Sequence, residues 1–199
     1  MLRRAPQTPG TGLARRLHRF LRGRDGVAIV DFALVVPVLV FLLLGAMEVG
    51  RYVLLNQKLS RLAISTSDLT SQAKHAVVAD INQIFAAAKY TMRPFDIGTR
   101  GLVFITSVST DDTVPITPTV DWQMSGGGTG TFTSQVGTAT GATATLPPNF
   151  TMDANQNIII AEVFYTYQPF FFGKVISPKV IRQIGLHYPR LRPLQTLIP

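Results

Sequence analysis

The chain has 199 residues, a formal net charge of +8 at pH 7, 46% hydrophobic residues and no cysteine. The absence of cysteine excludes a disulfide framework and a thiolate metal site. Seven of the 19 basic residues precede Gly26, where one acidic residue accompanies them, so the remainder of the chain is close to neutral.

Residues 1–26 form a basic leader, and an apolar run follows from Val27 to Met47. This run is long enough for a helix that spans a bilayer, which takes about 20 residues. A secretory signal peptide explains this run less well, because the apolar core of a signal peptide is shorter and ends in an A-x-A-like site. Arginines next to a spanning segment are better explained by cytoplasmic retention and anionic lipid than by nucleic acid. We therefore expect a transmembrane helix over residues 27–49 with a cytoplasmic N-terminus.

Two residues inside the apolar run are candidates for a special role. Asp31 places a carboxyl group near one end of the predicted span, where a charge is costly and usually has a partner. Asp31 is therefore a candidate for intramembrane charge pairing and assembly. Pro37 lacks a backbone N–H, so it predicts a kink in the helix.

An amphipathic helix is predicted to continue the span over residues 50–93, because these residues include no proline. Its apolar side chains are spaced by three, four or seven residues and make one stripe. The leucines of this stripe, which we expect to pack against a sheet, are Leu55, Leu59, Leu62 and Leu69.

The region 94–189 is predicted to be β-rich and to lie outside the membrane. Segments 101–109 and 157–167 are rich in β-branched and aromatic residues, and segments 120–124 and 180–188 are weaker strand candidates. The low-complexity segment 125–145 is interpreted as a mobile surface loop, and residues 190–199 as a loose C-terminal tail. The predicted fold class is α+β, with a long helix packed against a small antiparallel sheet, as in pilins.

A search for catalytic and ligand-binding groupings gives no candidate. The histidines His18, His75 and His187 have no second ligand at a metal-binding spacing, and Asp111-Asp112 is interpreted as a turn. No nucleophile elbow, zinc-protease motif or phosphate-binding loop occurs. We therefore expect no enzyme, cofactor, metal or small-molecule substrate. The run Phe170–Phe172 is the best candidate for an exposed apolar contact surface.

Two motifs in and after the apolar run resemble a known family. Residues 26–39 read GVAIVDFALVVPVL, and residues 45–51 continue as GAMEVGR. A glycine, an acidic residue, an aromatic residue, Ala-Leu and a proline, followed by Gly-x-x-Glu-x-Gly-Arg, resemble the TadE/TadG-like proteins of bacterial tight-adherence (Tad, Flp-type) pilus systems. The family's usual Glu in the first motif is Asp31 here, one methylene shorter. The chain length leaves no room for a von Willebrand-type domain, which favours a short TadE-like or TadF-like pseudopilin.

The resemblance implies a role in pilus assembly and cell adhesion at the bacterial inner membrane, with the C-terminal domain periplasmic. It implies that a prepilin peptidase cuts between Gly26 and Val27, and that Asp31 then pairs with a free α-amino group. The implied partners are membrane lipid, that peptidase, other Tad pilus components and other pseudopilins. The alternative is an uncleaved single-pass envelope adaptor unrelated to pili, in which Asp31 reaches water at the interface.

Overall fold

The computed structural model describes residues 25–174 and 176–199. Residues 1–24 of the predicted leader therefore lie outside the described residues. Its helices are α2 (Asp25–Ser71), α3 (Val78–Thr91) and the short 3-10 helix η1 (Gly98–Arg100). Its strands are β1 (Ala76–Val77), β2 (Gly101–Ser109), β3 (Thr119–Gly126), β4 (Asn157–Tyr167), β5 (Lys179–His187) and β6 (Leu197–Ile198). The predicted α+β class, a long N-terminal apolar helix with a small antiparallel sheet, is confirmed.

The chain separates into two compact units, Met1–Met47 and Glu48–Pro199, and the boundary falls inside α2. In the first unit the described residues are the N-terminal part of α2. The second unit holds the rest of α2, the other helices and every strand named above.

The predicted single helix over residues 50–93 is wrong, because α2 ends at Ser71 and α3 begins at Val78. In a continuing helix the Ser71 carbonyl would accept the N–H of the residue four positions later. It accepts the Arg190 N–H instead, with 3.0 Å between nitrogen and oxygen. Residues 76–77 then pair in parallel with residues 197–198. The C-terminal segment therefore ends the helix by competing for its backbone groups.

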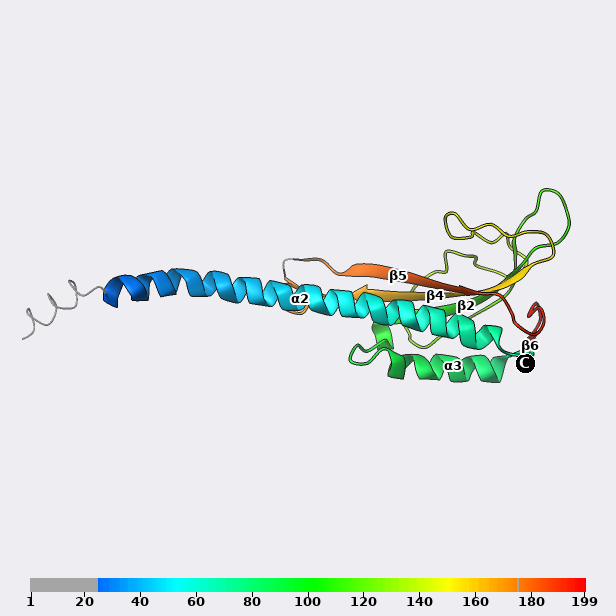
Figure 1. The fold of residues 1–199 in the computed structure, drawn as a ribbon. Coiled ribbons are helices and arrows are strands. Elements are labelled where there is room, and N and C mark those ends of the chain that lie inside the picture. The colour runs from blue at the N-terminus through cyan, green and yellow to red at the C-terminus, as the bar shows by residue number, and fades with distance from the viewer. Residues whose placement is uncertain (1–24, 175) are drawn as a thin grey trace, which may run out of the picture. The chain divides into compact units, whose positions relative to one another are not determined.

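The main sheet has four antiparallel strands in the order β3-β2-β4-β5. All four predicted strand segments are confirmed, and β2 and β4 have the predicted bounds. Figure 1 shows α3 and the C-terminal part of α2 along one face of this sheet. The central strands β2 and β4 are buried along almost their whole length, which explains their nearly continuous apolar sequences.

The helix-facing core includes Leu55, Leu59 and Leu62 of α2, as predicted, together with Ile105, Ile159 and Val163 of the sheet. Leu69 does not join it and is half exposed, so that part of the prediction is wrong. Small residues occupy the buried side of the last two turns of α2, among them Ala63, Thr66, Ser67 and Thr70. Leu69 lies at the margin of this side, since a helix turns about 100° per residue.

Strand β5 approaches α2 closely at Gly185. A Cβ atom at this glycine would lie 2.3 Å from the carbonyl oxygen of Ala63, so any side chain would collide with the helix backbone. The neighbouring polar residues on the same face also meet α2: the Gln183 amide donates to Asn56, and His187 bonds to Ser67. The polar face of β5 therefore faces the helix.

The opposite face of the sheet is covered by the long connection between β3 and β4. Val136, Ala144 and Met152 are buried there against Val120 and Ile160. The prediction of a surface loop over residues 125–145 is therefore wrong for its central part. Small residues allow this close approach, since a Cβ atom at Gly137 would lie 2.5 Å from Val120 Cγ2.

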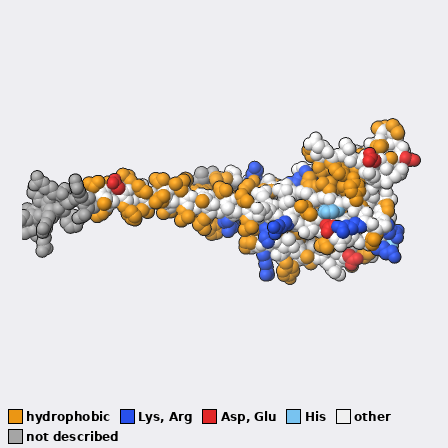
Figure 2. Space-filling model, in the orientation of Figure 1, with side chains coloured by type: hydrophobic (Ala, Val, Ile, Leu, Met, Phe, Trp, Pro, Cys, Tyr) orange, Lys and Arg blue, Asp and Glu red, His pale blue; other side chains and the backbone are white. Residues whose placement is uncertain are grey.

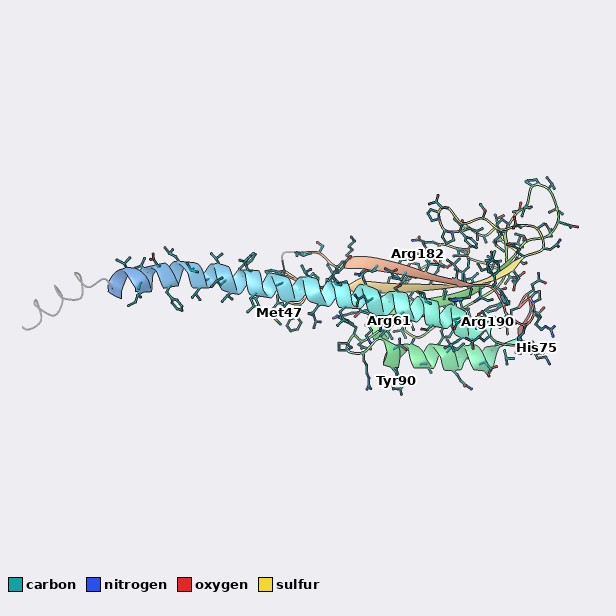
Figure 3. The ribbon with its side chains drawn as sticks, viewed as in Figure 1. Met47, Arg61, His75, Tyr90, Arg182 and Arg190 are labelled. Carbon is teal, nitrogen blue, oxygen red and sulfur yellow. The ribbon has the colours of Figure 1, made fainter. Side chains whose placement is uncertain are left out.

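The C-terminal segment 190–199 is held to the folded unit and is not a loose tail, so this prediction is wrong. Leu194 is buried, its carbonyl accepts the Trp122 indole N–H at 2.6 Å, and its own N–H donates to Asn157 Oδ1 at 2.8 Å. The Arg190 guanidinium pairs with the Asp68 carboxylate on α2. Figure 3 shows Arg190 and His75 at the end of α2 where β6 also lies.

Candidate functional site

The residues predicted as the cleavage and assembly site all lie in the N-terminal part of α2. Gly26 and Val27 are exposed on its first turn, and Asp31 is exposed one turn later. The Asp31 carboxylate makes no hydrogen bond or ion pair with any of the described residues. The helix continues through Pro37, and the kink at this residue stays a prediction.

The apolar side chains of this part of α2 are uncovered. Within residues 25–174 and 176–199, α2 is the one helix long and apolar enough to cross a membrane, and its most apolar stretch has no buried residue. In Figure 2 hydrophobic side chains are exposed along the visible length of this segment. Lipid would cover such a surface in a bilayer, so α2 is able to act as a membrane anchor. Its exposed large side chains include Val27, Ile29, Phe32, Leu34, Leu39, Phe41 and Leu43.

A cluster of side-chain and backbone donors surrounds Glu48, the residue directly after the apolar run. Its side chain is 7% exposed, although it carries a carboxyl group. The Tyr167 hydroxyl donates to Glu48 Oε1, and the backbone N–H groups of Phe170 and Phe171 donate to Oε2 at 3.0 and 2.9 Å. All three donors lie at the end of β4 or directly after it. Glu48 therefore joins α2 to the loop that leads from β4 to β5.

The hydroxyl of Tyr167 has a raised pKa, because it is buried and because it contacts Glu48. Burial raises its pKa, and the hydrogen bond and the negative charge of Glu48 raise it further, to about 12. Tyr167 thus stays protonated and donates to the carboxylate at neutral pH. Its ring also packs edge-to-face on Tyr52 of α2, with 5.2 Å between the ring centroids.

A cation completes the surroundings of Glu48. The Arg51 guanidinium lies 5.2 Å from the ring centroid of Phe170 and 5.6 Å from that of Phe95. A guanidinium over an aromatic face is attracted by the ring quadrupole. Arg51 also lines a small pocket of about 150 Å³ with Tyr165 and Tyr167. The charge of Glu48 is therefore balanced by local donors and by a cation one turn along the helix.

In the sequence, Glu48 is recognisable only as part of the second motif and not as a site. Its partners are backbone N–H groups more than a hundred positions away in the sequence, and these have no side-chain signature. One signal was available: a carboxylate directly after a long apolar run is costly without a partner.

A second buried carboxylate, Glu162 on β4, has a structural role. It is 0% exposed and pairs with Arg182 of β5, with 2.6 Å between Oε1 and Nη2. The Ser134 hydroxyl and the Gln135 N–H also donate to it. The carboxylate therefore ties the long β3–β4 connection to the sheet.

The histidines and acidic residues are dispersed. His187 bonds to Ser67 at 2.8 Å between Nδ1 and Oγ, His75 lies at the end of α2, and His18 is outside the described residues. Asp111 accepts from the N–H and hydroxyl of Thr113, as in a turn. In the part of the chain that the structure describes, no three His, Asp or Glu side chains form a group that could hold a metal ion.

Comparison with known proteins bears on the N-terminal part of the chain. Neither curated proteins nor solved structures give a match. The family model described as TadE-like protein matches residues 26–65, which include Gly26, Asp31, Pro37 and Glu48. The resemblance seen in the two sequence motifs is therefore confirmed, since residues 26–65 match the model of the TadE-like family.

Proposed function

We propose that this protein is a non-enzymatic, membrane-anchored pseudopilin that takes part in assembling a tight-adherence (Flp-type) pilus or a related secretion system. The observation that carries the proposal is that the TadE-like match over residues 26–65 contains the uncovered apolar part of α2. A helix exposed in this way needs lipid or neighbouring helices around it. A membrane-bound assembly of pseudopilins and other Tad pilus components supplies both.

The proposed location is the bacterial inner membrane, with residues 1–26 in the cytoplasm and the sheet-containing unit in the periplasm. The arginine cluster before Gly26 supports this orientation, because basic flanks are retained on the cytoplasmic side. Reporter fusions after Tyr90 test it. An exported reporter should be active there, and activity of a cytoplasm-only reporter would reverse the orientation.

We also propose that a prepilin peptidase cuts between Gly26 and Val27. Both residues are exposed, and they lie in the first described turn of α2. Glycine has a weak helix preference, so Gly26 lowers the cost of unwinding this turn into an extended substrate. The amino-terminal sequence of the protein purified from membranes should begin at Val27. Gly26→Leu should leave the leader attached, which the intact mass of the protein would show.

Asp31 is the proposed assembly residue. A carboxylate on an otherwise apolar exposed helix is tolerable in a membrane when it is paired, and the free α-amino group made by cleavage, its own or a neighbour's, is the proposed partner. Asp31→Ala should still yield a membrane-inserted protein with a folded outer unit, but it should not support pilus formation or co-purify with pilus components.

Two control variants separate charge from shape at this position. Asp31→Glu keeps the carboxylate and should retain function. Leu34→Ala removes an exposed apolar side chain one turn away and should also retain it. Full piliation of the Asp31→Ala strain would refute the role of Asp31. Normal piliation after deletion of the gene, together with a protein that still begins at Met1, would favour the uncleaved envelope adaptor.

A further inference from the structure

Two phenylalanines of the loop after β4 are exposed in an unusual way. Phe170 is 70% and Phe171 36% exposed, and their rings pack on each other edge-to-face with 4.9 Å between centroids. Two large aromatic side chains at one loop position make an apolar patch rather than isolated surface residues. Exposure of such a patch to water is unfavourable, so we ask what covers it.

Glu48 holds this pair in its place beside α2. The backbone N–H groups of both phenylalanines donate to its carboxylate at 3.0 and 2.9 Å between nitrogen and oxygen. Glu48 directly follows Met47, which is labelled in Figure 3 and is the last residue of the apolar run. Consecutive residues of a helix differ by 1.5 Å along its axis. The loop backbone is therefore hydrogen-bonded to the first residue beyond the stretch that would occupy the bilayer.

One basic side chain lies beside the pair, and a second is in the same loop. Arg51, one turn after Met47, lies 5.2 Å from the Phe170 ring centroid, and Lys174 is exposed in the same loop. Aromatic residues and cations beside a spanning helix are typical of the zone between lipid chains and headgroups. In that zone, aromatic rings generally enter the boundary of the acyl chains, and cationic side chains approach the lipid phosphates.

We propose that Phe170 and Phe171 insert into the interface of the same bilayer that α2 spans, and so form a second membrane contact of the folded unit. Glu48 is the positioning residue, since its carboxylate holds the loop backbone at that depth. The inference rests on the membrane-spanning role of α2 in the proposed function. It holds for either orientation of the chain and does not require a pilus. A protein partner is the competing occupant of this surface.

Depth measurements on the purified full-length chain in nanodiscs of zwitterionic and anionic phospholipid test the inference. The chain has no cysteine, so single-cysteine variants accept one spin label each without further changes. Phe170→Cys reports on the loop. Leu39→Cys, within the apolar run, is the lipid reference, and Val114→Cys, at a side chain 92% exposed on the folded unit, is the water reference. The label is probed with oxygen, which concentrates in lipid, and with a water-soluble nickel chelate.

The expected result is an oxygen-to-nickel accessibility ratio at position 170 several-fold above that at position 114 and close to that at position 39. A ratio at position 170 equal to that at position 114, with position 39 in lipid, overturns the inference and leaves the patch to a protein partner. Water-like ratios at all three positions would show that α2 does not span the bilayer. They would overturn both this inference and the membrane anchor of the proposed function.

A second variant guards against disturbance by the label. Phe170→Trp keeps an aromatic side chain, and lipids brominated along their chains quench tryptophan that reaches them. The only native tryptophan, Trp122, is buried in the folded unit and provides a constant background. Extra fluorescence from position 170 that brominated lipid quenches would support insertion, and extra fluorescence that it leaves unchanged would overturn it.

Discussion

One helix, α2, serves in two different environments. Before Glu48 its large apolar side chains, such as Leu34 and Leu39, are exposed. From Glu48 onward it presents a buried side to the sheet, with Leu55 and Leu59 fully covered. The secondary structure is the same in both parts, and the difference lies in what covers the side chains. An apolar residue of α2 therefore has a different function on each side of residue 48.

The same substitution on the two sides should disturb two different properties, membrane binding and folding, and these are the largest changes we expect. Leu39→Asp places a carboxylate in the middle of the span, where insertion scales assign a cost of about 2.5–3.5 kcal/mol. It should lower the membrane-bound fraction and leave the thermal unfolding of the unit Glu48–Pro199 unchanged. Leu59→Asp buries an unpaired charge in the core and should abolish folding of that unit. Membrane fractionation and Trp122 fluorescence measure the two effects, and equal responses of both variants would contradict the comparison.

A milder pair of substitutions tests which side of α2 forms the core. Leu62 is buried and Leu69 is half exposed, so Leu62→Ala should lower the free energy of unfolding by roughly 2–5 kcal/mol. Leu69→Ala removes the same atoms without leaving a cavity and should cost well under half as much. Denaturant unfolding followed by Trp122 fluorescence provides the values. A similar loss in both variants would show that the buried side extends to Leu69.

The fold elements with strong local signals could be predicted from sequence. The β-branched and aromatic segments 101–109 and 157–167 became β2 and β4 with the same bounds, because buried central strands require such residues. The stripe of Leu55, Leu59 and Leu62 was predicted correctly, since its spacing matches the helix period.

Features that depend on distant backbone groups could not be predicted. The end of α2 requires the Arg190 N–H, and the position of Leu194 requires the Trp122 indole and the Asn157 amide. The cover of the second sheet face comes from a Gly- and Thr-rich segment in which Val136 is one of few apolar residues. Composition indicated a loop there, but not that its small residues let it lie against the sheet.

The close approach of β5 and α2 provides another test within the folded unit. Gly185→Ala places a methyl group 2.3 Å from the Ala63 carbonyl oxygen, and overpacking of this kind costs roughly 1–3 kcal/mol. Gly50→Ala, on the same helix, meets nothing within 4 Å and should stabilise by roughly 0.5–1 kcal/mol, because alanine prefers the helix. Opposite signs in thermal unfolding are expected. A neutral Gly185→Ala would show that β5 can move away from α2 without loss.

The smallest expected effect concerns pH and the contact between Glu48 and Tyr167. The pKa of Tyr167 is about 12 in the folded state and about 10 in an unfolded chain, so folding holds this proton more tightly. The resulting stabilisation is fully present below about pH 10 and is lost as the pH rises through about 12. Tyr167→Phe removes both the titration and the hydrogen bond to Glu48. The variant should therefore be less stable than the natural chain at pH 8, by roughly 1–3 kcal/mol.

This difference should shrink between about pH 10 and pH 12, because ionised Tyr167 in the natural chain repels the Glu48 carboxylate that it otherwise binds. Urea unfolding of the detergent-solubilised protein at several pH values measures the difference. Tyr90→Phe, at an exposed position on α3 (Figure 3), controls for the loss of a phenol elsewhere. A difference that stays constant from pH 8 to pH 12 would show that the hydroxyl of Tyr167 does not titrate with folding. The loop carrying Phe170 would then be held to α2 by its backbone N–H groups alone.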